Sequence, residues 1–115
     1  MFFHQSNLPI TQIDANSTRQ VLAHGDGLMN ALITFQHALP ETATIPLHQH
    51  PHVQTTYVLK GAFKFEIDYP DHQAIQVVHQ GDAIYFPANH PHGCIPLEDD
   101  SKLLDSFTPI REDFL

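Results

Sequence analysis

The chain has 115 residues, 42% of them apolar, and a formal net charge of -8 from 13 acidic and 5 basic side chains. This length and composition are typical of one globular domain with a single core. The acidic balance argues against a nucleic-acid partner, because a polyphosphate backbone would be repelled. The sequence contains no apolar run of membrane-spanning length and its first residues lack a signal-peptide pattern, so we expect a cytoplasmic protein without a membrane partner.

Turn residues interrupt the chain about every 8 to 12 residues, and no segment keeps a helical period. Residues 1–18 are mostly polar around a few apolar side chains, and we expect them to form an N-terminal arm that packs on a partner subunit. A barrel with a C-terminal tail is predicted over residues 19–115. Its strands are expected at 19–24, 28–38, 46–59, 63–69, 74–79, 83–86, 92–97 and 102–107. Short strands at this spacing predict an all-β sandwich or barrel.

The segment 63–69 gives the clearest strand pattern, because apolar and charged side chains alternate without exception. Its charged face would carry Lys64, Glu66 and Asp68, and its apolar face aromatic and aliphatic side chains. This alternation predicts a strand that is buried on one side only.

The stretch 46–54, Pro-Leu-His-Gln-His-Pro-His-Val-Gln, concentrates potential metal ligands. Two prolines and the β-branched residues that follow favour an extended backbone over a helix. In an extended backbone His48, His50 and Gln54 share one face, so we expect them to converge on a site carried by the sheet. His52 has the same parity and is an alternative ligand to Gln54. Otherwise we expect His52 to line the mouth of the site.

A second block, residues 81–96, reads Gly-Asp-Ala-Ile-Tyr-Phe-Pro-Ala-Asn-His-Pro-His-Gly-Cys-Ile-Pro. Together the two blocks resemble the motifs of the cupin family, G-x5-H-x-H-x(3,4)-E-x6-G and G-x5-P-x-G-x2-H-x3-N. The resemblance implies an all-β, single-domain cupin, a double-stranded β-helix or jelly-roll barrel. It also implies that one divalent transition metal (Ni, Zn, Fe, Mn or Cu) is bound by His48, His50, Gln54 and His92.

The sequence departs from the cupin motifs at four positions. Thr42 stands for the opening Gly, Gln54 for Glu, Asn89 for the internal Gly and Pro96 for the closing Asn. Only Gln54 occupies a ligand position. Asn89 is a mild change, because asparagine tolerates the left-handed turn conformation that glycine usually supplies.

The ligand set limits the chemistry of such a site. Three imidazoles and an amide oxygen are neutral, so a bound dication would keep its full charge. This favours polarisation of sugar oxygens and attraction of an anion. Oxygen chemistry is less favoured, since no carboxylate is present to compensate a higher oxidation state of iron.

The last predicted strand carries the second group of interest. Leu103, Asp105 and Phe107 share one face, so if Leu103 belongs to the core, Asp105 also points inward. An inward carboxylate is costly unless it is hydrogen-bonded or functional, which makes Asp105 a candidate for proton transfer. The alternative is an aspartate on an edge strand or capping a turn.

Arg111 follows this strand, and its planar fork can grip a carboxylate in two hydrogen bonds, the alternative being a surface ion pair with Glu112 or Asp113. The end of the chain, the opening Met-Phe-Phe and the glutamine in the carboxylate slot resemble the KdgF branch of small cupins. In that branch a D-x-F-x-P-x-R-x-D-F pattern accompanies the metal. The resemblance implies Asp105 as the catalytic group, with Phe107 and Arg111 binding the substrate.

KdgF-type proteins convert 4,5-unsaturated uronate monosaccharides to the linear 5-keto-4-deoxyuronate. The resemblance therefore implies a metal-dependent, ring-opening isomerase that acts on a small anionic sugar. Two alternatives stay open: a cupin that binds or senses a small molecule without catalysis, and a three-histidine dioxygenase. The apolar residues 1–3 and an unpaired barrel edge also predict a homodimer.

Overall fold

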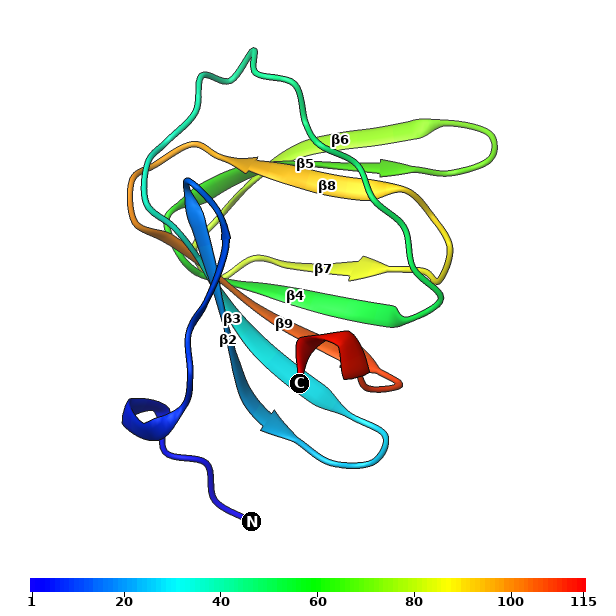
Figure 1. The fold of residues 1–115 in the computed structure, drawn as a ribbon. Helices are drawn as coiled ribbons and strands as arrows, with labels where there is room; N and C mark the ends of the chain where they lie inside the picture. Colours follow the sequence, from blue (N-terminus) through cyan, green and yellow to red (C-terminus); the bar gives the residue numbers. More distant parts are fainter.

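The computed structural model describes residues 1–115 as two antiparallel sheets that face each other (Figure 1). The larger sheet has the strand order β1-β2-β3-β9-β4-β7, and the smaller has the order β6-β5-β8. Two short 3-10 turns, η1 (Gln5–Asn7) and η2 (Glu112–Phe114), lie near the ends of the chain. None of the helical segments is long or apolar enough to cross a membrane. The strands are β1 (Thr11–Asp14), β2 (Ser17–His24), β3 (Met29–Phe35), β4 (Val53–Lys60), β5 (Ala62–Asp68), β6 (Gln73–His79), β7 (Ala83–Phe86), β8 (His92–Pro96) and β9 (Ser101–Thr108).

An apolar core holds the two sheets together. The alternation predicted for residues 63–69 is confirmed on β5, where apolar side chains are buried and the charged ones between them are partly exposed. Burying one large apolar side chain contributes about 1.5–3 kcal/mol. The buried face of β5 therefore helps to hold the smaller sheet against the larger one. The main cluster draws on β4, β5, β6, β7 and β9 and consists of Val58, Phe63, Phe65, Ile67, Val78, Phe86 and Leu103.

Strand β9 lies in the middle of the larger sheet, between β3 and β4. Leu103 and Phe107 are each 3% exposed, and Asp105 lines the same interior cavity as both of them. The inward direction predicted for this face is therefore confirmed. In the register with β4, Asp105 stands opposite Thr56 and Phe107 opposite Gln54.

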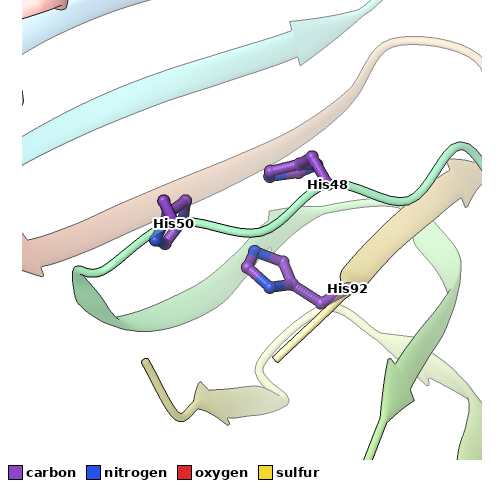
Figure 2. Close-up of side chains that lie close together, drawn as sticks. All are labelled: His48, His50 and His92. Carbon is purple, nitrogen blue, oxygen red and sulfur yellow. The ribbon is translucent and has the colours of Figure 1, made fainter. Parts of the chain in front are cut away.

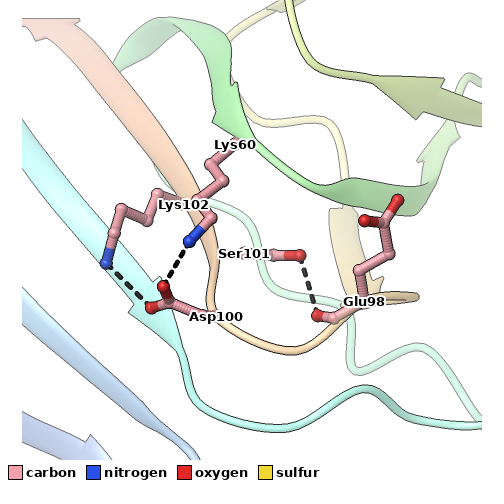
Figure 3. A network of polar contacts seen from close by, with 5 residues as sticks. All are labelled: Lys60, Glu98, Asp100, Ser101 and Lys102. Atoms are coloured by element: carbon pink, nitrogen blue, oxygen red, sulfur yellow. Dashed lines mark hydrogen bonds and ion pairs between the residues drawn. The ribbon is translucent and has the colours of Figure 1, made fainter.

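The far end of the β4–β9 pair is fixed by a polar network (Figure 3). Lys60 and Lys102 both donate to the Asp100 carboxylate, at 2.5 and 3.0 Å, and Ser101 Oγ donates to the Glu98 carbonyl at 2.8 Å. Both ion pairs are exposed to solvent, so they contribute little to stability. They lie where β9 begins, at the opposite end of the strand pair from Phe107.

The histidine stretch differs from its prediction, because β4 begins only at Val53. Residues 46–52 belong to an irregular loop that runs past β8 (Figure 1). Pro46 and Pro51 lack the N–H donors that a continuous ladder needs, so only one isolated bridge forms, between His48 and His92. The expectation that a strand carries His48 and His50 is therefore wrong, although the bridge joins His48 to β8.

The N-terminal arm is also shorter than expected, because β1 begins at Thr11 and pairs with β2, which begins at Ser17. The predicted arm, residues 1–18, therefore contains an edge strand of the larger sheet. Met1 and Phe2 are fully exposed in the single chain. Packing of this segment on a second subunit stays a prediction.

Gly93 lets the loop dock on β8. A Cβ at Gly93 would collide with the Pro46 carbonyl, whereas a Cβ at Gly27 would meet nothing within 4 Å. We expect Gly93→Ala to lower the free energy of unfolding by about 1–3 kcal/mol, the usual effect of overpacking. Gly27→Ala is the matched control and should change stability by less than about 0.5 kcal/mol. Urea unfolding measures both, and equal stabilities of the two variants would contradict the docking argument.

Candidate metal centre and substrate cavity

Three histidines come together from two segments of the chain. His48 and His50 lie on the loop before β4, and His92 is the first residue of β8 (Figure 2). One ring nitrogen of each lies within 4.8 Å of those of the other two. The three histidines that the cupin resemblance implies as ligands therefore lie together, although a loop supplies two of them.

Hydrogen bonds fix the tautomers of two of these rings. His50 Nδ1 lies 3.1 Å from the His52 carbonyl, and His92 Nδ1 lies 2.9 Å from the His90 carbonyl. A carbonyl only accepts, so each Nδ1 carries the proton and each Nε2 keeps its lone pair. Both Nε2 atoms are buried and have no hydrogen-bond partner.

Such buried, unpaired nitrogens fit a metal. An unsatisfied polar atom is costly unless something binds it, and ligating histidines commonly donate their other ring N–H to a backbone carbonyl. Burial lowers the pKa of His92 to about 4 and is also the main cause of the lowered pKa values of His48 and His50. The three imidazoles are therefore neutral at pH 7, as ligation requires.

A hydrogen-bonded chain runs from the larger sheet toward the histidines. Gln54 Nε2 donates to Thr56 Oγ1 at 2.9 Å, and Thr56 Oγ1 donates its one proton to Asp105 Oδ1 at 2.7 Å. Because Thr56 engages the amide nitrogen, the amide oxygen of Gln54 remains available. The Gln54 side chain acts to raise the pKa of His50, so the amide lies beside that ring. This placement is compatible with Gln54 as a fourth ligand.

Asp105 is a buried carboxyl. Burial raises its pKa to about 6, against the opposing effects of the Thr56 hydrogen bond, the Arg111 charge and Gln54. A carboxyl with such a pKa can accept or release a proton near neutral pH. Asp105 therefore has the protonation chemistry needed for proton transfer, the role for which its inward position on β9 made it a candidate.

Apart from His50, these side chains line a cavity of about 310 Å³, at the lower end of the range for small-molecule sites. His48, His92, Gln54 and Asp105 contribute polar atoms to its wall, and Phe107 an apolar face. The cavity therefore offers metal ligands, a carboxyl and an apolar wall to one small molecule.

His52 does not line the cavity, contrary to the expectation that it lies at the mouth. Its Nε2 lies 3.3 Å from the Ile110 carbonyl, and its ring meets Phe107 edge to face with centroids 6.2 Å apart. The C-terminal tail covers it. Its contribution to the site is the backbone carbonyl that orients His50.

Arg111 forms the ion pair with Asp113 that was the alternative to substrate binding, and its grip on a substrate carboxylate stays a prediction. It lines the cavity, and its Nη2 and Nε also donate to the Asp113 carboxylate at 3.0 and 3.3 Å. Its guanidinium carbon lies 4.2 Å from the centre of the Phe114 ring. The η2 turn thus holds Arg111 at the cavity.

Two further residues of the site were not predicted from the sequence. Thr56 has the parity of Gln54 on β4, so strand alternation could have placed it in the interior. Arg19 lines the cavity from β2, where no local motif marks it.

A family model for the cupin domain matches residues 34–105, so the chain belongs to the cupin family. Within that family it is similar to the pectin degradation protein KdgF of Dickeya dadantii (strain 3937). The two are 30% identical over 115 residues, which cover 99% of this chain and 97% of that protein. The predicted family and its all-β fold are confirmed.

Two solved structures are also similar. KdgF from Halomonas sp. has a TM-score of 0.85 and 31% identity, over 100% of this chain and 98% of that one. An RmlC-like cupin from Shewanella frigidimarina NCIMB 400 has a TM-score of 0.84 and 31% identity, over 99% and 95% of the two chains. The likeness therefore includes the arm and the tail, which lie outside the cupin-domain match.

Acid should destabilise the metal-free protein. The pKa of His92 is about 4 in the fold, against 6.5 ordinarily, so the unfolded chain binds more protons between these pH values. Stability therefore falls as pH falls through this window, on the order of 3 kcal/mol from this residue. Thermal melts of chelator-treated protein at several pH values measure the effect. His92→Asn should have a shallower pH dependence, and an unchanged slope would contradict the assignment.

Proposed function

We propose that this protein is a metal-dependent cupin that opens 4,5-unsaturated uronate monosaccharides to linear 5-keto-4-deoxyuronate. The observation that carries the proposal is Asp105, a buried carboxyl with a raised pKa, joined through Thr56 and Gln54 to the edge of a three-histidine group. The likeness to KdgF proteins over nearly the whole chain supports the substrate class. We also propose that the protein is cytoplasmic and forms a homodimer. The exposure of the apolar side chains Met1 and Phe2 supports the dimer.

The reaction is an isomerisation that needs one proton-transfer group. The anomeric hydroxyl of the cyclic sugar loses its proton, and the bond between C1 and the ring oxygen breaks, which leaves an aldehyde at C1 and an enolate at C5. The enolate gains a proton at C4 and becomes a ketone. Atoms and electrons balance without an oxidant or reductant, so one carboxyl such as Asp105 can accept the first proton and deliver the second.

The remaining residues bind and orient the sugar. A divalent metal held by His48, His50, His92 and Gln54 would supply polarisation of the sugar oxygens. Arg111 would attract the carboxylate at C6. Phe107, which is 3% exposed, forms the apolar wall that keeps water from the reacting carbons.

One assay separates this proposal from its alternatives. Unsaturated monouronate released by a polysaccharide lyase is mixed with the pure protein, and absorbance of the conjugated double bond is followed. Ring opening removes the absorbance without consuming oxygen. A binding or sensing cupin would leave the absorbance unchanged, and a dioxygenase would consume oxygen in step with substrate.

Asp105→Asn should lower turnover about 100- to 10,000-fold, the usual range for a general acid or base. Asparagine keeps an oxygen that can accept the Thr56 hydrogen bond, so fold and metal content should stay unchanged. The same absorbance assay, with metal analysis of both proteins, measures the effect. A variant that turns over at the wild-type rate would remove Asp105 from the mechanism.

Thr56 should set the pH range of the reaction. If Asp105 must be ionised, activity rises as pH rises through about 6, or somewhat lower once a cation neighbours it. The Thr56 hydrogen bond lowers this pKa, so Thr56→Val should move the inflection of kcat/KM about one pH unit higher. Thr56→Ser keeps the hydroxyl and should behave like the wild type. An inflection that stays in place in the valine variant would contradict the hydrogen-bonded chain.

A further inference from the structure

Arg19 is the one cationic side chain of this protein without an acceptor. Four of the five cations have one: Lys60 and Lys102 bind the Asp100 carboxylate, Lys64 donates to the Glu41 carbonyl, and Arg111 binds Asp113. Arg19 makes no side-chain hydrogen bond and no ion pair, although it lines the cavity beside Arg111. We propose that Arg19 binds the substrate carboxylate as the second arginine of the site, an inference that rests on the proposed function.

The position of Arg19 on β2 directs it to the interior. It stands opposite Ile33 of β3 in the antiparallel register, and Ile33 and Ser17 line the same cavity. Its guanidinium is partly withdrawn from water, and this burial lowers its pKa. A partly desolvated cation without a hydrogen-bond acceptor is unfavourable, so an anion in the cavity would be stabilised by it.

Phe114 holds the two arginines as a pair. The guanidinium carbons of Arg19 and Arg111 lie 3.8 and 4.2 Å from the centre of its ring, within the range of cation–π contacts. The two like charges disfavour each other, which is seen in the lowering of the Arg19 pKa by Arg111. A carboxylate close to both relieves this repulsion.

Asp113 shows what a carboxylate does beside this pair. It receives two hydrogen bonds from Arg111, and the charge of Arg19 also helps to lower its pKa. Its side chain is 64% exposed while that of Arg111 is 21% exposed, so Asp113 reaches the pair from the solvent side. The side of the arginine pair that faces the cavity can therefore accept a second carboxylate.

The number of free N–H donors indicates that Arg19, rather than Arg111, makes the bidentate contact with the substrate carboxylate. A guanidinium has five N–H donors, and Asp113 engages the Nε and Nη2 edge of Arg111. That edge is the one best suited to two parallel hydrogen bonds, whereas all five donors of Arg19 are uncommitted. Arg19 therefore supplies the bidentate grip on the sugar carboxylate, and Arg111 supplies charge and its remaining N–H groups.

Arg19→Met tests this assignment, because methionine keeps an apolar stem against Phe114 and loses every donor. The Michaelis constant for unsaturated monouronate should rise about 10- to 100-fold, with kcat changed by only a few-fold. Calorimetry with D-galacturonate, a uronate that lacks the C4=C5 bond, should show the same loss, while D-galactose should bind all proteins equally weakly. Arg19→Lys keeps the charge but loses the planar guanidinium, so its Michaelis constant should lie between those of the wild type and Arg19→Met.

Lys60→Gln is the matched control, since it removes one positive charge at the opposite end of β4 from Gln54. It should leave the Michaelis constant unchanged. Metal content and the unfolding temperature of each variant report whether the fold is intact, and if Arg19→Met does not fold, Arg19→Lys decides.

Three results would overturn the assignment: an unchanged Michaelis constant in the folded arginine variants, an equal rise in Lys60→Gln, or a loss of metal that accounts for the whole effect. Arg19-dependent binding of galacturonate by a protein that never opens the unsaturated sugar would support the assignment and remove the proposed reaction. Turnover of the unsaturated sugar without any dependence on Arg19 would do the reverse.

Discussion

The register of β4 against β9 determines where the chemistry of this protein lies. It sets Val58 opposite Leu103 in the core, then Thr56 opposite Asp105, then Gln54 opposite Phe107. A slip by one residue would turn Asp105 to the other face of the sheet. The fold tolerates a buried carboxyl here because Thr56 donates to it at 2.7 Å. The same hydroxyl accepts from Gln54, so one cross-strand pair orients both the proposed proton-transfer group and a potential ligand.

The histidines depend on that sheet although two of them lie on a loop. Backbone hydrogen bonds in both directions, at 3.0 and 2.9 Å, join His48 to His92, and Asn89 N donates to the His50 carbonyl at 2.8 Å. Asn89 has a φ of 62°, so it adopts the left-handed conformation expected for an asparagine that replaces glycine. An irregular segment held by these hydrogen bonds can position ligands as firmly as a strand. Because the prolines prevent continuous strand pairing, the histidine rings are not forced to alternate between faces and can converge.

How far the sequence predicts the site follows from the range of each interaction. The spacing of His48 and His50 is a local signal, and the alternation on β9 needs only one strand, so both could be predicted without a structure, whereas His92 was assigned by the resemblance to the cupin motifs. Strand parity failed for His52, because the prolines end the ladder and the ring turns to the tail at Ile110. Arg19 was missed because its partners, Arg111 and Phe114, lie about ninety residues away in the chain. A contact of this kind depends on the closure of the whole sheet and leaves no motif.

The charge distribution is compatible with the proposed anionic substrate, although the protein as a whole is acidic. The formal net charge is -8, yet two of the five cations line the cavity. At physiological ionic strength exposed charges are screened beyond about 8 Å, so most surface carboxylates have little influence on a ligand inside the cavity. Charges within the cavity act through a less polar medium and are screened less. The acidic surface therefore suits solubility, while Arg19 and Arg111, placed around one aromatic ring, would provide the local field for the proposed uronate substrate.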